Sequence, residues 1–261
     1  MAITTTHAPG TFCWPELATS DQAGAEKFYG ALFGWTVEKS PMGPDAHYTI
    51  FQLNGVPVAA GATMQPEQKA QGIPPHWLSY VATADVDASL AKAKGLGGTA
   101  LAGPFDVMEH GRMAILADPT GGVFALWQAR QHSGVGVLDE THALVWTELA
   151  TDDPKKAGAF YEALLGWKGE AYPGMDYTVM KRGDAMVAGV MPKTPEMGPM
   201  PTQWMPYIGV DDCAATLAKA ESLGGKAIAG PIPVPGVGLM GCITDPQGAH
   251  ISLMQFTGQG G

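Results

Sequence analysis

A tryptophan and a glutamate separated by one residue occur twice in this chain, as Trp14–Glu16 and as Trp146–Glu148. The residues around the first pair, 11–18, are apolar enough to form a strand, and residues two apart in a strand point to the same face. A carboxylate packed beside an indole is partly removed from water, which raises its pKa. Such a group can accept a hydrogen bond from a ligand or act as a general base. A structural role, in which the glutamate braces a neighbouring strand or faces solvent, is equally open from the residue types alone.

Other polar and aromatic side chains extend the set of candidate residues. Arg112 could hold a carboxylate, phosphate or enolate oxygen, and Tyr48 could stabilise an oxyanion. With Glu16, these two form our candidate catalytic set. The candidate ligand-binding residues are Trp14, His47, His76, Trp77, His110, Trp146, Glu148, Tyr177 and Trp204. Each has a structural alternative, such as a loop histidine in solvent, a half-buried strand tyrosine or a surface arginine.

The chain contains an internal repeat that must position these residues. When residues 11–36 are laid over 143–168, thirteen of the 26 positions are identical. The offset is 132 here and becomes 127 from Trp77 and Trp204 onward, so the copies differ in length by five residues, within the stretch 36–77 of the first copy. Insertions and deletions fall in loops. We therefore predict two similar domains, at 8–130 and 140–257, with residues 129–141 as the linker between them.

Within the first copy the pattern alternates between strands and helices. Asp21 is a typical helix N-cap, followed by apolar residues at helical spacing and by Gly34 as the helix end. Strands are predicted at 47–53 and 56–63 around the turn Asn54-Gly55. A strand at 77–83, a helix at 86–96 and strands at 99–102, 112–117 and 122–128 follow. We interpret this order as two βαβββ modules in each copy, although only two strands after the first helix are marked by the pattern, and this predicts an α+β protein with four such modules.

The composition excludes several classes of protein. Hydrophobic residues make up 46% of the chain and charged residues 15%, and the formal net charge is −10. An acidic surface repels nucleic acid and anionic membranes, so we expect neither as a partner. We find no apolar run long enough to span a membrane and no signal peptide, and the three cysteines are widely spaced. These features predict a cytoplasmic protein.

In its repeat and its motifs the sequence resembles the vicinal oxygen chelate superfamily, which includes glyoxalase I, extradiol dioxygenases and bleomycin-resistance proteins. The resemblance rests on residues 28–35 and 160–167, on DxDAxLAKA at 85–93, with its counterpart at 211–220, and on DPTGGVFALWQ at 118–128, with its counterpart at 245–255. It covers nearly the whole chain and is strongest for two-domain, glyoxalase-like proteins of about 27 kDa, some described as secreted antigens. The resemblance implies tandem glyoxalase-like domains, in which paired modules form two incomplete barrels with a ligand in each concave face.

Metal-dependent members of that superfamily carry His, Gln or Glu on defined strands of the paired modules. Carried over one by one, these positions fall on Trp14, Leu78, Ala60 and Ala125 in the first copy and on Trp146, Met205, Gly189 and Ser252 in the second. None is a good metal ligand, apart from a weak donor in Ser252. We therefore predict no metal site and no cofactor, and rank a metal-dependent glyoxalase or dioxygenase below the alternatives.

Two functions remain. The first is a metal-independent lyase, isomerase or hydrolase that acts on a small carbonyl or hydroxylated metabolite. The second is a binding or sequestering protein that captures a flat compound without turnover. The imidazoles and the guanidinium are concentrated in the first copy, so that pocket is the one we expect to be active if only one is. A monomer and a homodimer are both compatible with the sequence.

Overall fold

A computed structural model describes residues 2–43 and 46–257 of the chain. Its first half runs through β1 (Phe12–Thr19), α1 (Gln22–Phe33), β2 (Thr36–Pro41), β3 (His47–Leu53), β4 (Val56–Thr63), α2 (Pro66–Ala70), β5 (His76–Ala82), α3 (Val86–Gly95), β6 (Thr99–Val107), β7 (Gly111–Ala117) and β8 (Val123–Ala129). Its second half runs through β9 (Leu144–Thr151), α4 (Pro154–Leu165), β10 (Lys168–Ala171), β11 (Thr178–Arg182), β12 (Ala185–Pro192), the 3₁₀ turn η1 (Pro195–Met197), β13 (Gln203–Gly209), α5 (Cys213–Ser222), β14 (Lys226–Val234), β15 (Gly238–Thr244) and β16 (His250–Phe256).

The predicted helix ends are confirmed. The Asp21 side chain accepts a hydrogen bond from the N–H of Gly24 at 3.0 Å, and Gly34 ends α1 with φ of 72°, in the left-handed region that suits glycine. Asp153 caps α4 in the same way. The turn between β3 and β4 has positive φ at both Asn54 and Gly55, as this hairpin type requires. Local sequence therefore sets where these elements begin and end.

Two edge strands differ from the prediction. β2 was not predicted, because it is largely exposed and its charged residues give no apolar alternation. β6 continues to Val107, whereas this strand was predicted only over residues 99–102. Both strands lie at a sheet edge, where one side of the backbone needs no partner and proline is tolerated.

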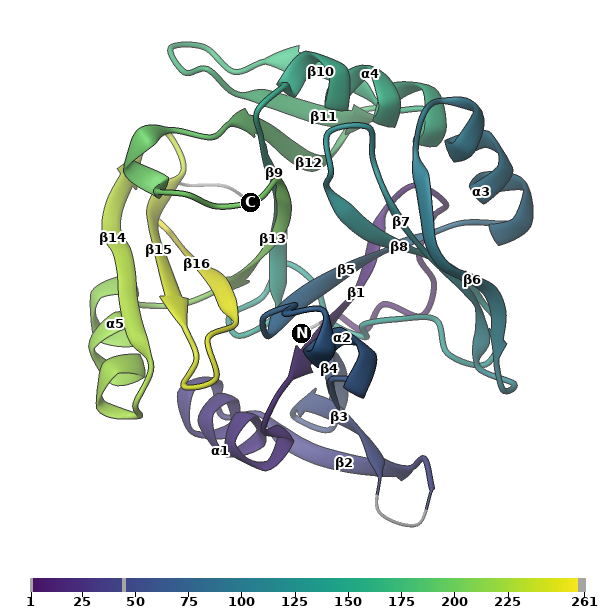
Figure 1. Ribbon diagram of the computed structural model, residues 1–261. Helices are drawn as coiled ribbons and strands as arrows, with labels where there is room; N and C mark the ends of the chain where they lie inside the picture. The colour runs from purple at the N-terminus through teal and green to yellow at the C-terminus, as the bar shows by residue number, and fades with distance from the viewer. Residues whose placement is uncertain (1, 44–45, 258–261) are drawn as a thin grey trace.

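Each half of the chain forms one eight-stranded mixed sheet. The strand orders are β2-β3-β4-β1-β5-β8-β7-β6 and β10-β11-β12-β9-β13-β16-β15-β14. In the first sheet β1 pairs antiparallel with β5 at the centre, while β1–β4 and β5–β8 are parallel pairs. The two modules of each half therefore join through their first strands, and the sheet curls into the incomplete barrel that the resemblance implies (Figure 1).

Each sheet has one face that packs on helices and one that does not. On β1, Leu17 belongs to a helix-packed cluster, whereas Trp14 belongs to a cluster on the opposite face. We call the helix-free face of the first sheet, with Trp14, Glu16, Tyr48 and Tyr80, the first cup. The second cup is the corresponding face of the second sheet, with Trp146, Glu148, Tyr177 and Tyr207.

The helix-packed cores are shared between the two halves. One core joins Phe28, Tyr29 and Leu32 of α1 to Leu217 of α5 and Ile251 of β16. The other core combines residues of α3, β7 and β8 with residues of α4, β11 and β12. Figure 1 shows α1 beside α5 and α3 beside α4. The two copies therefore pair with each other within one chain through their helical layers.

A reciprocal pair of buried hydrogen bonds ties the halves together. Tyr29 donates to Asp245 Oδ2 at 3.0 Å, and Tyr161 donates to Asp118 Oδ2 at 2.8 Å. The other carboxylate oxygen of each aspartate accepts backbone N–H groups of its own turn. Each half thus supplies a tyrosine from its first helix and receives one at the turn before its last strand.

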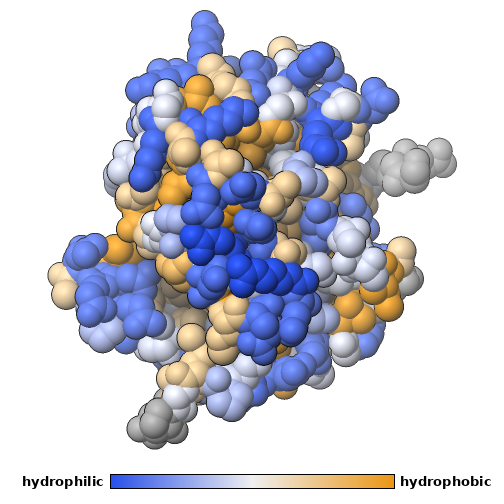
Figure 2. All heavy atoms as spheres, turned by 90° about the vertical axis from the view of Figure 1, so that its right-hand side faces the viewer, coloured by the Kyte–Doolittle hydropathy of each residue, from blue (hydrophilic) through white to orange (hydrophobic). Residues whose placement is uncertain are grey.

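The surface on the side of β6 and α3 has no continuous apolar layer like those between the two halves. Figure 2 shows hydrophobic residues interspersed with hydrophilic ones on this face. Exposed apolar side chains of β6 and the turn that follows it include Leu101, Phe105 and Met108. Among the described residues, no helix is both long and apolar enough to cross a bilayer.

Replacing Tyr29 or Tyr161 by phenylalanine tests the tie between the halves. Each change leaves a buried aspartate oxygen without its tyrosine donor, and an indole N–H without its acceptor, since Trp77 and Trp204 donate to these hydroxyls. We expect each variant to lose about 2 kcal/mol or more of unfolding free energy, measured by urea denaturation. Tyr172→Phe is the matched control, because its hydroxyl bonds to Pro235 O near the surface, and it should lose less than about 0.5 kcal/mol. Equal losses in all three variants would contradict this assignment.

Candidate functional site in the two cups

The strands at the centre of the first sheet bring the predicted glutamate into the first cup. In register, Trp14 lies opposite Tyr80, and Glu16 lies opposite Leu78 on one side and Ala60 on the other. The side chains of Ala60 and Leu78 cannot form hydrogen bonds with the carboxylate. These two cross-strand neighbours therefore do not compensate for the water that the carboxylate loses. Both members of the Trp-x-Glu pair therefore face the cup, as predicted from strand periodicity.

Two tyrosine hydroxyls hold the Glu16 carboxylate. Tyr48 donates to Glu16 Oε2 at 2.5 Å, and Tyr80 donates to Oε1 at 3.1 Å. Trp14 Nε1 in turn donates to the Tyr48 hydroxyl oxygen at 3.0 Å. Because an indole N–H can only donate, the order from Trp14 through Tyr48 to Glu16 has a fixed direction. The carboxylate ends this chain as an acceptor, and each of its oxygens has capacity for a further bond.

The second cup repeats this arrangement. Tyr207 donates to Glu148 Oε1 at 2.8 Å, and Trp146 Nε1 donates to the Tyr177 hydroxyl at 2.8 Å. Hydrogen bonding by the nearby Tyr177 hydroxyl also lowers the pKa of Glu148. Tyr80 and Tyr207 were absent from the candidate set. Their recurrence in strand phase with the cup residues Leu78 and Met205 was the signal that could have identified them.

Burial and hydrogen bonding act in opposite directions on these glutamates. Removal from water raises the pKa of Glu16 and of Glu148, and the tyrosine hydrogen bonds lower each pKa by a smaller amount. Burial raises the pKa of Tyr48 and Tyr80 well above the usual range, and the nearby Glu16 charge raises them further. The tyrosines therefore stay protonated and act as hydrogen-bond donors to the two glutamates.

The two cups differ in which groups a ligand can reach. Glu16 is half-buried, whereas Glu148 is only 7% exposed. The apolar positions show the opposite trend, because Trp14 is 4% exposed while its counterpart Trp146 is half-buried. The other apolar pairs that differ in this direction are Leu78 with Met205 and Met113 with Met240. The first cup presents its carboxylate, and the second presents its apolar wall.

The structure places Trp77 and Trp204 outside the cups, so their prediction as ligand-binding residues is corrected. Both alternate with the cup residues along their strands and lie on the helix-packed face. Trp77 donates to Tyr29 at 3.1 Å, and Trp204 donates to Tyr161 at 2.8 Å. They belong to the tie between the two halves and are buried within it.

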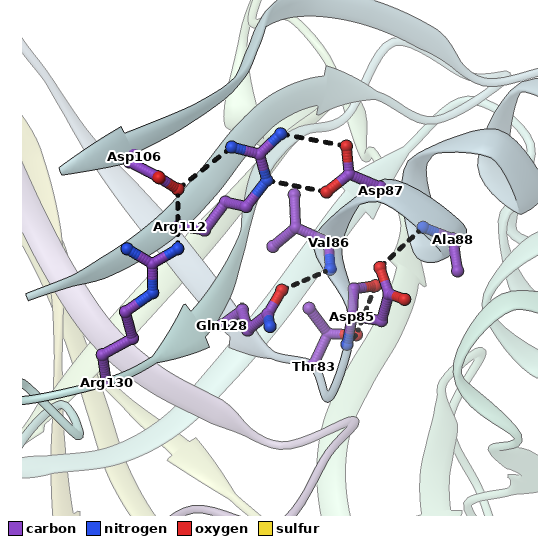
Figure 3. A network of polar contacts seen from close by, with 9 residues as sticks. All are labelled: Thr83, Asp85, Val86, Asp87, Ala88, Asp106, Arg112, Gln128 and Arg130. Atoms are coloured by element: carbon purple, nitrogen blue, oxygen red, sulfur yellow. Dashed lines mark hydrogen bonds and ion pairs between the residues drawn. The ribbon is translucent and has the colours of Figure 1, made fainter.

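Arg112 also lies on the helix side of its sheet, which corrects its prediction as an oxyanion-holding residue. Figure 3 shows its guanidinium between Asp87 of α3 and Asp106 of β6. Nε and one terminal nitrogen bond to the two oxygens of Asp87 at 2.7 and 3.0 Å, and the other terminal nitrogen bonds to Asp106 at 3.0 Å. Asp106 additionally accepts from Arg130 at 2.9 Å. This is a surface ion-pair network that joins α3 to β6 and β7.

The predicted histidines are not gathered at the first carboxylate. His47 lies on the helix side, where its Nε2 is 2.9 Å from Glu26 Oε1. His76 begins β5 in phase with the cup residues, but its Nδ1 bonds to Pro74 O at 2.9 Å. His110 lies in the turn between β6 and β7. The structure therefore brings together Trp14, Glu16 and Tyr48 of the first-copy candidates.

His132 contacts the first cup although the sequence placed it in the linker. Its ring packs edge-on against Trp14, with centroids 4.5 Å apart, and lies 6.0 Å from the ring of Trp127. Trp127 Nε1 donates to the His132 backbone oxygen at 2.9 Å. No periodicity marks this residue, because it follows the last strand in an irregular segment.

The donor chemistry of the cups does not fit a divalent metal ion. Indole, leucine, alanine, methionine and glycine side chains at the carried-over positions provide no anionic or imidazole ligand. Across residues 2–43 and 46–257, no group of three or more His, Cys, Asp or Glu side chains is placed to hold a metal ion.

A shallow surface hollow of about 550 Å³ lies away from both cups. It is lined by the end of α1, by residues 140–142 and by Asp211 and Lys219. The Lys219 ammonium is engaged there with Leu32 O at 3.0 Å. None of the predicted site residues lines this hollow, so it is separate from the candidate site.

Comparison with known proteins agrees with this geometry. The family model described as Glyoxalase/Bleomycin resistance protein/Dioxygenase superfamily matches residues 11–126 and 143–253. A protein of Mycobacterium bovis named "Putative glyoxylase CFP32" is 44% identical over 250 residues, covering 94% of this chain and 95% of the relative. The anthracycline biosynthesis protein DauV of Streptomyces sp. strain C5 is 34% identical, covering 97% of this chain and 95% of the relative.

Solved structures share the fold at low sequence identity. The Mn(II)-bound glyoxalase from Novosphingobium aromaticivorans matches with a TM-score of 0.66 and 15% identity, covering 95% of this chain and 82% of that one. The 2,3-dioxygenase LapB from Pseudomonas sp. KL28 matches with a TM-score of 0.65 and 10% identity, covering 98% and 93%. At these identities the likeness concerns the fold alone.

The raised pKa values of Glu16 and Glu148 predict a pH dependence of stability. The unfolded carboxyls titrate near 4.5, so above that pH the native state holds more protons than the unfolded state. The unfolding free energy of the wild type should therefore fall, relative to a Glu16→Gln/Glu148→Gln double variant, as the pH rises from about 5 to about 8. Urea denaturation at both pH values measures the difference.

The exposed Glu38, replaced by glutamine, is the control for this comparison and should follow the wild type. A wild-type-minus-variant difference that is constant, or that grows with pH, would show that the native pKa values are not raised.

Proposed function

Because this chain belongs to the glyoxalase/bleomycin resistance protein/dioxygenase superfamily, we propose that its first cup binds a small carbonyl or hydroxylated metabolite and transfers a proton through Glu16. The reaction class is that of a lyase, isomerase or hydrolase which uses no metal ion. One observation carries the proposal: the Glu16 carboxylate is half-buried in an apolar cup and is held by two tyrosine donors.

The hydrogen bonds around Glu16 suit a general base. Tyr48 and Tyr80 fix the orientation of the carboxylate, and burial makes its neutral form easier to reach. In the proposed step a proton leaves a carbon or oxygen of the ligand and binds to a Glu16 oxygen. The neutral carboxyl is then a weaker hydrogen-bond acceptor than the ligand oxygen on which negative charge develops. A tyrosine hydroxyl therefore binds more favourably to that ligand oxygen.

Tyr48 is the residue that we expect to donate a hydrogen bond to the negatively charged ligand oxygen. Its hydroxyl can turn from Glu16 toward the ligand as the proton arrives, because Trp14 Nε1 continues to donate to its oxygen. The raised pKa of Tyr48 keeps its proton in place, so it donates a hydrogen bond without transferring the proton. Base and oxyanion donor are thereby supplied by adjacent side chains.

The apolar wall of the first cup and the named relatives support an organic ligand. Trp14, Leu78 and Trp127 surround the carboxylate with apolar surface. A relative named as a glyoxylase supports carbonyl chemistry, and one named for anthracycline biosynthesis supports a hydroxylated, carbonyl-bearing compound. Metal independence is supported by the donor set described above. No cofactor is part of the proposal.

The second cup favours binding without turnover, which is the alternative function for the chain as a whole. Glu148 is covered, while Trp146, Met205 and Met240 are half-buried and line an adaptable apolar surface. A flat compound could rest on this surface without reaching the carboxylate. Trp146 and Tyr177 remain our ligand-binding residues there.

We further propose a cytoplasmic location and a small molecule as the only class of partner besides a second copy of the chain. The location is supported by the three unpaired cysteines, of which Cys13 and Cys213 are buried. The acidic net charge opposes nucleic acid and anionic lipid partners. Because the two halves already pair within one chain, the structure gives no reason to require a homodimer.

Glu16→Gln separates an enzyme from a binder. Glutamine keeps the shape and an acceptor oxygen but cannot take a proton, so turnover of a panel of 2-oxoaldehydes and hydroxylated ketones should fall by about 10²- to 10⁴-fold. Affinity for the same compounds, measured by calorimetry, should change by less than about 10-fold. Glu38→Gln should behave as the wild type. Binding of the panel with no turnover by the wild type would favour the sequestering protein.

Metal analysis tests the other half of the proposal. We expect purified protein to contain substoichiometric transition metal by mass spectrometry, because the cups offer no suitable ligand set. Dialysis against a chelator should leave turnover unchanged. A stoichiometric metal whose removal abolishes turnover, and whose return restores it, would overturn metal independence.

A further inference from the structure

A buried side-chain nitrogen beside the first cup lacks a hydrogen-bond partner within residues 2–43 and 46–257. His132 Nε2 is removed from solvent and has no hydrogen-bond partner among the described residues. Most buried polar atoms in folded proteins are paired, and an unpaired one destabilises the fold. An unpaired atom beside a candidate site therefore needs an explanation, and a ligand that pairs with it is one.

The backbone segment that carries the His132 ring is anchored at several points. The backbone N–H of His132 donates to His110 O at 3.1 Å, and the backbone oxygen of His132 accepts from Trp127 Nε1 at 2.9 Å. Three residues later the chain is anchored again, where the N–H of Val135 donates to Cys13 O at 2.8 Å. The segment that leaves β8 is thus fixed to the strands of the cup, and the ring position is not that of a mobile linker.

The ring lies against the aromatic residues of the cup. Trp14 and Trp127 both belong to the apolar cluster of this face, and both rings approach His132 at steep angles of 82° and 67°. The same Trp14 indole orients Tyr48 and, through it, Glu16. His132 and Glu16 are therefore polar groups that lie next to one shared aromatic residue.

Burial, together with the neighbouring His110 and His7, lowers the pKa of His132 to about 4. The ring is neutral at neutral pH, and its second nitrogen can accept or donate a hydrogen bond according to tautomer. A neutral ring also packs between indoles without the penalty of a buried charge.

We propose that His132 is a ligand-binding residue of the first cup, whose Nε2 bonds to a second polar group of the ligand while Glu16 bonds to the first. The inference rests on the function proposed above and narrows its ligand class. The ligand is a flat, aromatic or conjugated compound with a hydroxyl or carbonyl group at each end. Its body lies in the first cup, against the edges that the largely buried Trp14 and Trp127 rings leave exposed.

The proposal also distinguishes the two cups. The repeat offset of 127 places the counterpart of His132 at position 259, which lies outside the described residues. In the sequence this position is Gln259, and two glycines follow it. No histidine of the second copy corresponds to His132 in sequence, so we assign selectivity for a ligand with two polar ends to the first cup.

A matched pair of probes and variants tests this assignment. The probes are 2,6-dihydroxynaphthalene, which has a hydroxyl at each end, and 2-naphthol, which lacks one of them. The variants are His132→Phe, which keeps an aromatic ring without nitrogen, Glu16→Gln, and His47→Phe as a control on the helix-packed face. Affinities are measured by calorimetry, and unfolding midpoints are measured without ligand.

We expect His132→Phe to weaken 2,6-dihydroxynaphthalene by about 3- to 10-fold and to leave 2-naphthol unchanged. Its unfolding midpoint should be equal to or above that of the wild type, because an unpaired buried nitrogen has been removed. His47→Phe should not alter the binding of either probe. A structural histidine would give the opposite pattern, with a lower midpoint and no selectivity between probes.

Two outcomes separate this inference from the proposed function. If Glu16→Gln lowers the turnover of the panel as expected while His132→Phe weakens neither probe, or weakens both equally, the function stands and the role of His132 is wrong. If Glu16→Gln leaves the turnover of the panel unchanged, or the wild type binds neither probe, the first cup is not the reacting site and both proposals fail.

Discussion

The hydrogen bonds that Tyr29 and Tyr161 donate to Asp245 and Asp118 are the constraint on which the rest of the structure depends. Each joins the first helix of one half to the turn before the last strand of the other. A buried carboxylate is tolerated only where donors satisfy both of its oxygens, and here the turn supplies one set and the tyrosine the other. The residues that make the repeat recognisable, the FY pair and the DP turn, are therefore also those that hold its two copies against each other.

This tie determines which surfaces remain for a ligand. The helical layers of both halves are used in packing against each other, so each sheet is left with one helix-free face. Curling of the sheet turns that face into a cup, and alternation along β1 and β9 directs the Trp-x-Glu pairs into it. The carboxylate is then buried by the same geometry that creates the cup, which is why its pKa rises without any neighbouring negative charge.

Duplication preserved the hydrogen-bond core of each cup and changed its surroundings. In both copies the tryptophan donates to one tyrosine, and a second tyrosine donates to the glutamate. Leu78 and Trp127 of the first cup correspond to Met205 and Met254 of the second, and the glutamate is reachable only in the first. A shared polar core with different walls is what two ligand preferences within one fold require, since specificity then depends on the apolar contacts around a common acceptor.

The sequence by itself determined the repeat, the α+β class, the helix caps at Asp21 and Asp153, and the facing of Trp14 and Glu16, because local spacing and strand periodicity set these features. The sequence could not determine which face of each sheet packs on helices and which face is left open. For a single strand residue it therefore did not show which of these two faces the side chain joins. Trp77, Arg112 and His47 were therefore assigned to the pocket, while the fold uses them on the helix-packed side. It also gave no signal for His132, whose proximity to Trp14 arises from a turn after the last strand. Contacts between segments far apart in the chain depend on sheet curvature and on the packing of the two halves, and only the tertiary structure decides them.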